Sequence, residues 1–167
     1  MRQFIVVARE GPTTGEFSLD DLPAAARVDL LARCVTASLL LSHGLREDVR
    51  TQLVLGDEFT VRFDSANLRG LHPDERSTAA LIRNALGERE EAIGHIPVEI
   101  SPGVSLVRMN LETVLGEVSE PIYRLHPDGT PKGELSPPDD AAFVLSNHQK
   151  FDEADAATIA EYTDGDI

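Results

Sequence analysis

Two segments of the chain place polar residues where they could bind a ligand. In the first, Phe143 to Phe151, an apolar run passes directly into small and polar residues (FVLSNHQKF). Backbone amides that follow a buried strand are free to bind the polar edge of a ligand, and the small Ser146 would let that ligand approach closely. An ordinary strand-to-helix loop explains the same residues, so both interpretations stay open.

The second segment, Asn67 to Arg76 (NLRGLHPDER), is a polar loop that enters a helix. Its two arginines, Arg69 and Arg76, could hold phosphate groups through charge-assisted hydrogen bonds. Asp74 and Glu75 suit the first turn of the helix, where the helix dipole favours negative charge. Helix capping alone would also account for this segment.

The motifs of several common enzyme classes are absent from the sequence. It has no phosphate-binding loop and no GxGxxG, HExxH or GxSxG pattern. The five histidines are scattered, and none has an i, i+4 partner, so we expect hydrogen-bonded or exposed imidazoles rather than metal ligands. The single cysteine, Cys34, cannot form an intrachain disulfide, which is typical of a protein in a reducing cytoplasm.

Hydrophobic patterning predicts strands that alternate with helices. Strand-like runs occupy residues 3–8, 51–55, 59–63, 104–107, 122–125 and 142–145. Helices are predicted at residues 23–41, 73–86, 110–115 and 153–161. Asp20 or Asp21 could cap the first helix and Gly44 could end it, while Gly56-Asp57 could form a tight turn between strands.

This alternation predicts a single α/β domain over residues 1–167 with a largely parallel sheet. In such sheets, ligands bind beyond the carboxyl ends of the strands. The rule points to the loops that follow Leu125 and Leu145.

The charge balance restricts how the chain could bind nucleic acid. With 29 acidic and 15 basic residues, the formal net charge is −14. This argues against binding RNA through overall charge, although a local arginine patch is compatible with it. An acidic surface with few lysines would suit a very salty cytoplasm, and an acidic protein from ordinary surroundings is the alternative. No apolar stretch reaches the roughly 18 residues of a membrane span, and no signal-peptide pattern is present.

Five sequence blocks, taken together, are specific to a known family. They are MRQFIVVARE, DLPAAARVDLLARCVTASLLLSHGLREDV, LHPDERSTAALIRNAL, IYRLHPDG and FVLSNHQKF, and they run along nearly the whole chain. With these blocks the chain resembles the archaeal tRNA pseudouridine N1-methyltransferase family, a branch of the SPOUT methyltransferases. The resemblance implies a SPOUT-type (α/β-knot) fold, with a mostly parallel sheet flanked by helices and a C-terminal trefoil knot. It also implies a cytoplasmic homodimer, bound S-adenosylmethionine (SAM), no metal, and N1-methylation of pseudouridine 54 in the T-loop of tRNA.

The same resemblance implies particular site residues. It places cofactor contacts at Leu125 and in the segment Ser146, Asn147 and His148, where relatives often have glycine at the serine position and aspartate at the asparagine position. Arg27, Arg33 and Arg46 also match family positions and could contact tRNA phosphate or a partner subunit. Arg69 and Arg76 join them as an RNA-facing patch. Surface ion pairing is the alternative for these arginines. No residue is assigned as the catalytic base.

Family members continue beyond the position of Ile167 with a short strand, a SAM-binding loop and a final helix that closes the knot. The resemblance therefore implies an incomplete knot, and weak or absent SAM binding, in these 167 residues. A non-catalytic RNA-binding or dimerisation module derived from the family is the alternative to a methyltransferase.

Overall fold

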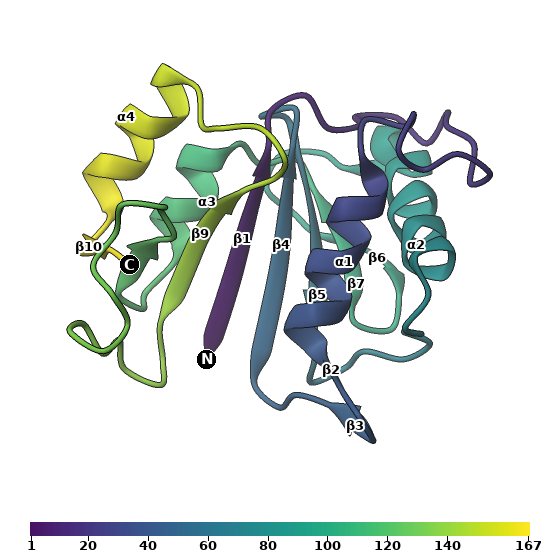
Figure 1. Cartoon of the computed structure of the whole chain (residues 1–167). Coiled ribbons are helices and arrows are strands. Elements are labelled where there is room, and N and C mark those ends of the chain that lie inside the picture. Colours follow the sequence, from purple (N-terminus) through teal and green to yellow (C-terminus); the bar gives the residue numbers. More distant parts are fainter.

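One eight-stranded sheet organises the computed structural model, which describes residues 1–167 (Figure 1). The strand order is β10-β8-β9-β1-β4-β5-β7-β6. Strands from β10 to β4 pair in parallel, and β5, β7 and β6 extend the sheet in antiparallel fashion. The strand bounds are β1 Arg2–Ala8, β4 Val49–Leu55, β5 Phe59–Asp64, β6 Val98–Ser101, β7 Val104–Val107, β8 Ile122–Arg124, β9 Ala142–Ser146 and β10 Gly165–Asp166. The predicted mostly parallel α/β sheet is confirmed.

Four α-helices cover the two faces of this sheet. They are α1 Val28–Leu39, α2 Glu75–Gly87, α3 Leu111–Glu117 and α4 Glu153–Tyr162, with a 3-10 turn at Arg89–Glu91. One apolar cluster joins α1 and α2 to β1, β4, β5 and β7, and a second joins α3 and α4 to the opposite face of β1, β8 and β9. No helix is both long enough and apolar enough to cross a membrane.

The first predicted helix, residues 23–41, is too long at both ends. Ala26 and Arg27 have φ angles of 53° and 57°, in the left-handed region, so the helix cannot begin before Val28. After Leu39 the chain instead forms a short hairpin of β2 (Leu40–Leu41) and β3 (Gly44–Leu45). Gly44 therefore belongs to a hairpin rather than to a helix stop. The leucines of this hairpin extend the apolar pattern of the helix, which explains the error.

The other predicted boundaries are close to the structure, but two short strands and the end of one helix differ from the prediction. Asp74 and Asn110 cap α2 and α3 through their side chains, and Gly56-Asp57 forms the turn between β4 and β5. Helix α3 includes Gly116 and ends at Glu117, two residues beyond the predicted end. Strands β6 and β10 were not predicted, because they are short strands at the two edges of the sheet order and are only partly buried.

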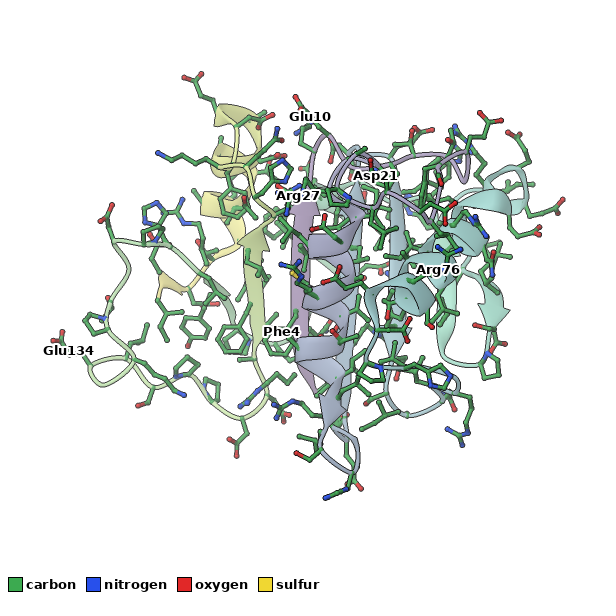
Figure 2. All side chains as sticks on the ribbon, turned by 45° about the vertical axis from the view of Figure 1, so that its right-hand side comes forward. Phe4, Glu10, Asp21, Arg27, Arg76 and Glu134 are labelled. Carbon is green, nitrogen blue, oxygen red and sulfur yellow. The ribbon has the colours of Figure 1, made fainter.

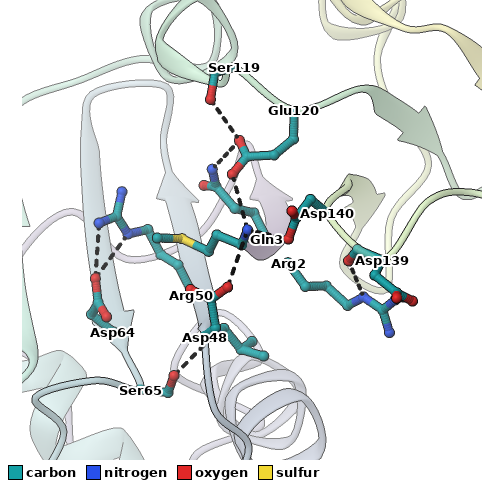
Figure 3. A network of polar contacts seen from close by, with 12 residues as sticks. Arg2, Gln3, Asp48, Arg50, Asp64, Ser65, Ser119, Glu120, Asp139 and Asp140 are labelled. Atoms are coloured by element: carbon teal, nitrogen blue, oxygen red, sulfur yellow. Dashed lines mark hydrogen bonds and ion pairs between the residues drawn. The ribbon is translucent and has the colours of Figure 1, made fainter.

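Parallel pairing brings the carboxyl ends of β1, β8 and β9 to one edge of the sheet, which we call the carboxyl edge. Helix α1 runs back from this edge, so its first residue lies there as well (Figure 1). At the opposite, amino edge, a polar network joins the strand starts (Figure 3). There Gln3 donates to Glu120 at 3.0 Å, and Arg50 pairs with Asp64 at 2.9 Å.

Candidate cofactor and RNA site

The ends of β8 and β9 bring two of the predicted cofactor residues together. The backbone N–H of Leu125 donates to the carbonyl of Val144 at 2.9 Å, directly after the paired residues Arg124 and Val144. Ser146 is the last residue of β9 and pairs with Val7 of β1. Leu125 and Ser146 therefore lie at the same edge of the sheet, where parallel α/β sheets bind ligands.

The loop after β9 has hydrogen-bond donors that the protein does not use. The backbone of Asn147 is fixed by its N–H bond to the Val7 carbonyl at 3.2 Å, and its Oδ1 accepts from the N–H of Gln149 at 3.0 Å. Its Nδ2 is buried and has no partner, and the N–H groups of His148 and Lys150 donate to no protein group. A buried donor without a partner is costly, so this loop is suited to a ligand that carries acceptors.

Four charged residues, Arg9, Asp57, Asp152 and Asp155, form an ion-pair cluster next to this loop. Arg9, which follows β1, donates through Nε to Asp155 at 3.1 Å, and its Nη1 lies 3.4 Å from Asp57 and its Nε 3.2 Å from Asp152. The hydrogen bond that Arg9 donates to Asp155 is the main cause that raises the pKa of Arg9. Asp57 also accepts from the N–H of Leu111, so α3, α4 and the β4–β5 turn all meet at the end of β1. Sequence reasoning missed this cluster because its members are far apart in the chain.

The predicted RNA residue Arg27 lies at the start of α1, at the carboxyl edge (Figure 2). Its Nε and Nη2 donate to the two oxygens of Asp29, each at 2.9 Å. The Asp29 side chain is only 3% exposed, and Arg33 lies 3.6 Å from it. The hydrogen bond from Arg27 holds the pKa of Asp29 below its usual value. Asp29 is therefore an ionised, buried group that fixes the arginine beside it.

Two other predicted RNA residues, Arg33 and Arg76, lie on the face formed by α1 and α2 and form polar contacts there. Arg33 pairs with Glu75, the first residue of α2. Arg76 donates to Asp20 at 2.8 Å and to the carbonyl of Leu19 at 3.0 Å, which attaches the long β1–α1 loop to α2. Figure 2 shows Arg76 on this face, away from the sheet edge where Arg27 lies. Both arginines have partners within the protein already.

The remaining two, Arg46 and Arg69, lie near the amino edge. The N–H of Arg46 donates to Leu39 at 2.8 Å, beside the β2–β3 hairpin, and the N–H of Arg69 donates to Pro102 at 3.2 Å in the β6–β7 turn. Neither guanidinium forms an ion pair. The five predicted arginines thus do not form one patch in a single chain: Arg27 alone lies at the carboxyl edge.

A groove of about 910 Å³ runs beside α1, over β1 and β9. Apolar side chains line much of it, and Leu41 and Leu125 at its border are 50% and 37% exposed. In the same sheet face Phe143 stacks against Phe4, with ring centroids 5.7 Å apart. No helix lies over β9 on this side of the sheet (Figure 1). Burial in this groove raises the pKa of Cys34.

The structure contains no cluster of three or more His, Cys, Asp or Glu side chains that could hold a metal ion.

Comparison with known proteins identifies the family. The model of the family described as "Putative SAM-dependent RNA methyltransferase" matches residues 1–167. The chain belongs to this family. It is 57% identical over 167 residues to the tRNA (pseudouridine(54)-N(1))-methyltransferase of Haloarcula marismortui, covering 98% of this chain and 84% of that protein. The proteins of the same name from Haloferax volcanii and Methanococcoides burtonii are 54% and 41% identical, covering 98% and 97% of this chain and 84% and 83% of theirs.

Among solved structures, the chain is similar to Archaeoglobus fulgidus Nep1 bound to S-adenosylhomocysteine. The TM-score is 0.63 at 12% identity, covering 97% of this chain and 86% of that one. At such low identity the likeness shows the fold alone. The predicted family and the SPOUT-type α/β fold are confirmed, and relatives from halophilic archaea support the interpretation of the acidic surface as salt adaptation.

Proposed function

We propose that this chain is a SAM-dependent methyltransferase that methylates N1 of pseudouridine 54 in tRNA. One observation carries the proposal: the chain is 57% identical, over 98% of its length, to a protein of that name. The similarity extends over nearly the whole chain, so the aligned region includes the strands and loops of the carboxyl edge described above.

The cofactor would bind where β8 and β9 end. SAM supplies an electrophilic methyl group on a sulfonium, and it carries acceptors in its carboxylate, ribose and adenine. Asn147 Nδ2 and the N–H of His148 are the unused donors that could meet such acceptors. Leu125 and Ser146 would form the adjacent wall, since Ser146 is small and Leu125 is 37% exposed.

The RNA would approach the same edge, because the methyl group must meet N1 in line with the bond that it leaves. Arg27 is the predicted arginine already at that edge. Arg33, Arg46, Arg69 and Arg76 would contribute from the α1–α2 face and the amino edge, either to the rest of the tRNA or to a partner subunit.

We also propose that the protein acts as a cytoplasmic homodimer, with a second copy covering the groove beside α1. Apolar Phe4, Leu41 and Leu145 line this groove, and its rim carries both Arg46 and Asp139. A rim with both signs of charge suits a two-fold contact, in which the same surface meets itself. Sedimentation of the purified chain tests this, since a monomer at micromolar concentration would contradict it.

A deletion strain tests the proposed activity. Its tRNA should contain pseudouridine at position 54 without the N1-methyl group, and the chain expressed in that strain should restore 1-methylpseudouridine. Unchanged methylation in the deletion strain would contradict the proposal. If the purified chain binds tRNA but methylation in the deletion strain is unchanged, the result would favour the alternative, a non-catalytic RNA-binding or dimerisation module.

A further inference from the structure

We infer that Asp29 is a positioning residue, which holds the guanidinium of Arg27 in a fixed orientation toward an oxygen acceptor of the bound RNA. The inference rests on the proposed function, because it concerns how the chain would bind its tRNA. It adds a buried carboxylate, which itself cannot reach the RNA, to the residues on which RNA binding depends.

The hydrogen bonds of Arg27 leave one side of its guanidinium unused. An arginine carries five N–H donors. In Arg27, Nε and Nη2 each give one to Asp29, and the other three donate to no group of the protein. Arg9 differs, because Nε, Nη1 and Nη2 all have carboxylate partners. Asp29 therefore binds the Nε and Nη2 side of the Arg27 guanidinium, and the other N–H donors remain available to a ligand.

The backbone of residues 26 and 27 makes this arrangement possible. Side chains at i and i+2 of a helix point in different directions and do not normally meet. Ala26 and Arg27 instead adopt positive φ angles just before the helix starts, which allows Arg27 to reach Asp29. Residues other than glycine rarely adopt this conformation, so the pairing depends on contacts that hold the backbone there.

Asp29 has the properties that such a support requires. Its side chain is 3% exposed, while that of Arg27 is 37% exposed. The carboxylate lies in the first turn of α1, at the carboxyl edge, and Arg33 approaches it from the other side at 3.6 Å. A fixed guanidinium loses less freedom when it binds an oxygen than a mobile one does.

Simple electrostatics and positioning predict opposite results for the same substitution. Asp29→Asn removes one negative charge from a chain of net charge −14, which alone should strengthen RNA binding. If Asp29 orients Arg27, the same substitution should weaken RNA binding. The sign of the change therefore decides between the two.

The experiment measures the affinity of the chain for a T-arm hairpin RNA that carries pseudouridine 54, by fluorescence anisotropy. We expect Arg27→Gln to weaken binding about tenfold and Asp29→Asn about three- to tenfold, as for a charge-assisted hydrogen bond. The double variant should bind no more weakly than Arg27→Gln, because the two residues act as one unit. Tighter or unchanged binding by Asp29→Asn would overturn the inference.

A matched pair at the amino edge controls for general effects. Arg50 and Asp64 also pair with each other, and their side chains are 30% and 28% exposed. They lie at the amino edge, at the opposite end of the parallel strands from Arg27 (Figure 3). Arg50→Gln and Asp64→Asn should leave RNA affinity within about twofold. If they weaken it as much as the Arg27 and Asp29 variants do, the effect is one of stability and the inference is wrong.

Arg27→Lys provides a test that leaves Asp29 buried and intact. Lysine keeps the charge but cannot form the two-point contact, so binding should weaken by about threefold. Unchanged binding would overturn the inference. The dependence of affinity on salt then identifies the acceptor: a phosphate contact lowers the slope by about 0.7 in Arg27→Gln, whereas a base carbonyl leaves it unchanged.

These outcomes separate this inference from the proposed function. A wild-type chain that does not bind the hairpin contradicts both. A wild-type chain that binds it, with Arg27 and Asp29 variants that bind equally well, contradicts only the inference.

Discussion

Arg9 and Asp155, which are 146 residues apart in the chain, bind each other at the carboxyl edge of the sheet. Arg9 follows β1, and Asp155 lies in the first turn of α4 with a side chain that is only 3% exposed. The loop that contains Asn147 and His148 lies between β9 and α4. The pair therefore determines where the candidate cofactor loop sits relative to the sheet.

Replacing Asp155 should destabilise the fold. Asp155→Asn leaves Arg9 without its main partner in a partly buried position, so we expect a loss of about 1–3 kcal/mol in the free energy of unfolding. Urea denaturation measures this. Glu134→Gln is the control, because that carboxylate is exposed, forms no ion pair and lies outside the groove beside α1, so it should change stability by less than about 0.5 kcal/mol. Equal stability of both variants would show that the Arg9–Asp155 pair does not hold α4.

Removing the unused donor of Asn147 should weaken cofactor binding without loosening the fold. Asn147→Ser keeps an oxygen that can accept from Gln149, but it lacks Nδ2. Because Nδ2 has no protein partner, the melting temperature should stay nearly constant. Affinity for SAM should fall about five- to tenfold, as for loss of one hydrogen bond in a buried site. Calorimetric titration with SAM checks this, and an unchanged dissociation constant would place the cofactor elsewhere.

Acid should destabilise the protein partly through Asp29 and Asp166. Arg27 and Arg124, respectively, hold the pKa of these carboxyl groups below the usual value of 3.8. A lowered folded-state pKa contributes stability above the unfolded-state pKa, and that contribution is lost as the pH falls through the folded-state value. Unfolding free energies should therefore decrease below about pH 4.

The variant Asp29→Asn tests whether Asp29 contributes to this acid dependence of stability. It should reduce stability at neutral pH and also make the acid dependence shallower, because the residue no longer titrates. Urea denaturation across the acid range measures both effects. An acid dependence as steep as that of the wild type would show that Asp29 contributes nothing to it.

High salt should stabilise the chain. A net charge of −14 repels itself at low ionic strength, and concentrated KCl screens this repulsion. We expect the melting temperature to rise substantially between about 0.1 M and 3 M KCl, where the Debye length falls well below 10 Å. Thermal unfolding across a KCl series tests this, and equal melting temperatures would contradict salt adaptation.

The sequence predicts the sheet well because its core strands carry continuous apolar runs. Residues 104–107 match β7, and Asp74 and Asn110 give clear helix starts. The start of α1 could not be predicted, since it depends on the left-handed backbone at Ala26 and Arg27, which brings the Arg27 side chain to Asp29. Local propensity contains no information about such a contact.

Part of the candidate site could likewise be predicted from the sequence, and part could not. Leu125 and Ser146 could be placed at one edge, because parallel strands of known direction end there. The distribution of the arginines could not be predicted, because it depends on how loops fold back. Arg76 reaches the β1–α1 loop and Arg69 reaches the β6–β7 turn, so residues close in sequence lie apart in space.

The methylation reaction itself tests the central claim most directly. The purified chain is incubated with SAM and tRNA that carries either pseudouridine or uridine at position 54, and the digested nucleosides are examined by mass spectrometry. In contrast to the weak or absent SAM binding that the family resemblance implies for these 167 residues, we predict 1-methylpseudouridine from the first tRNA. We predict no methylated nucleoside from the second, because uridine has no N–H at N1. A chain that binds the pseudouridine tRNA and SAM but transfers no methyl group, or that methylates both tRNAs, would contradict the account.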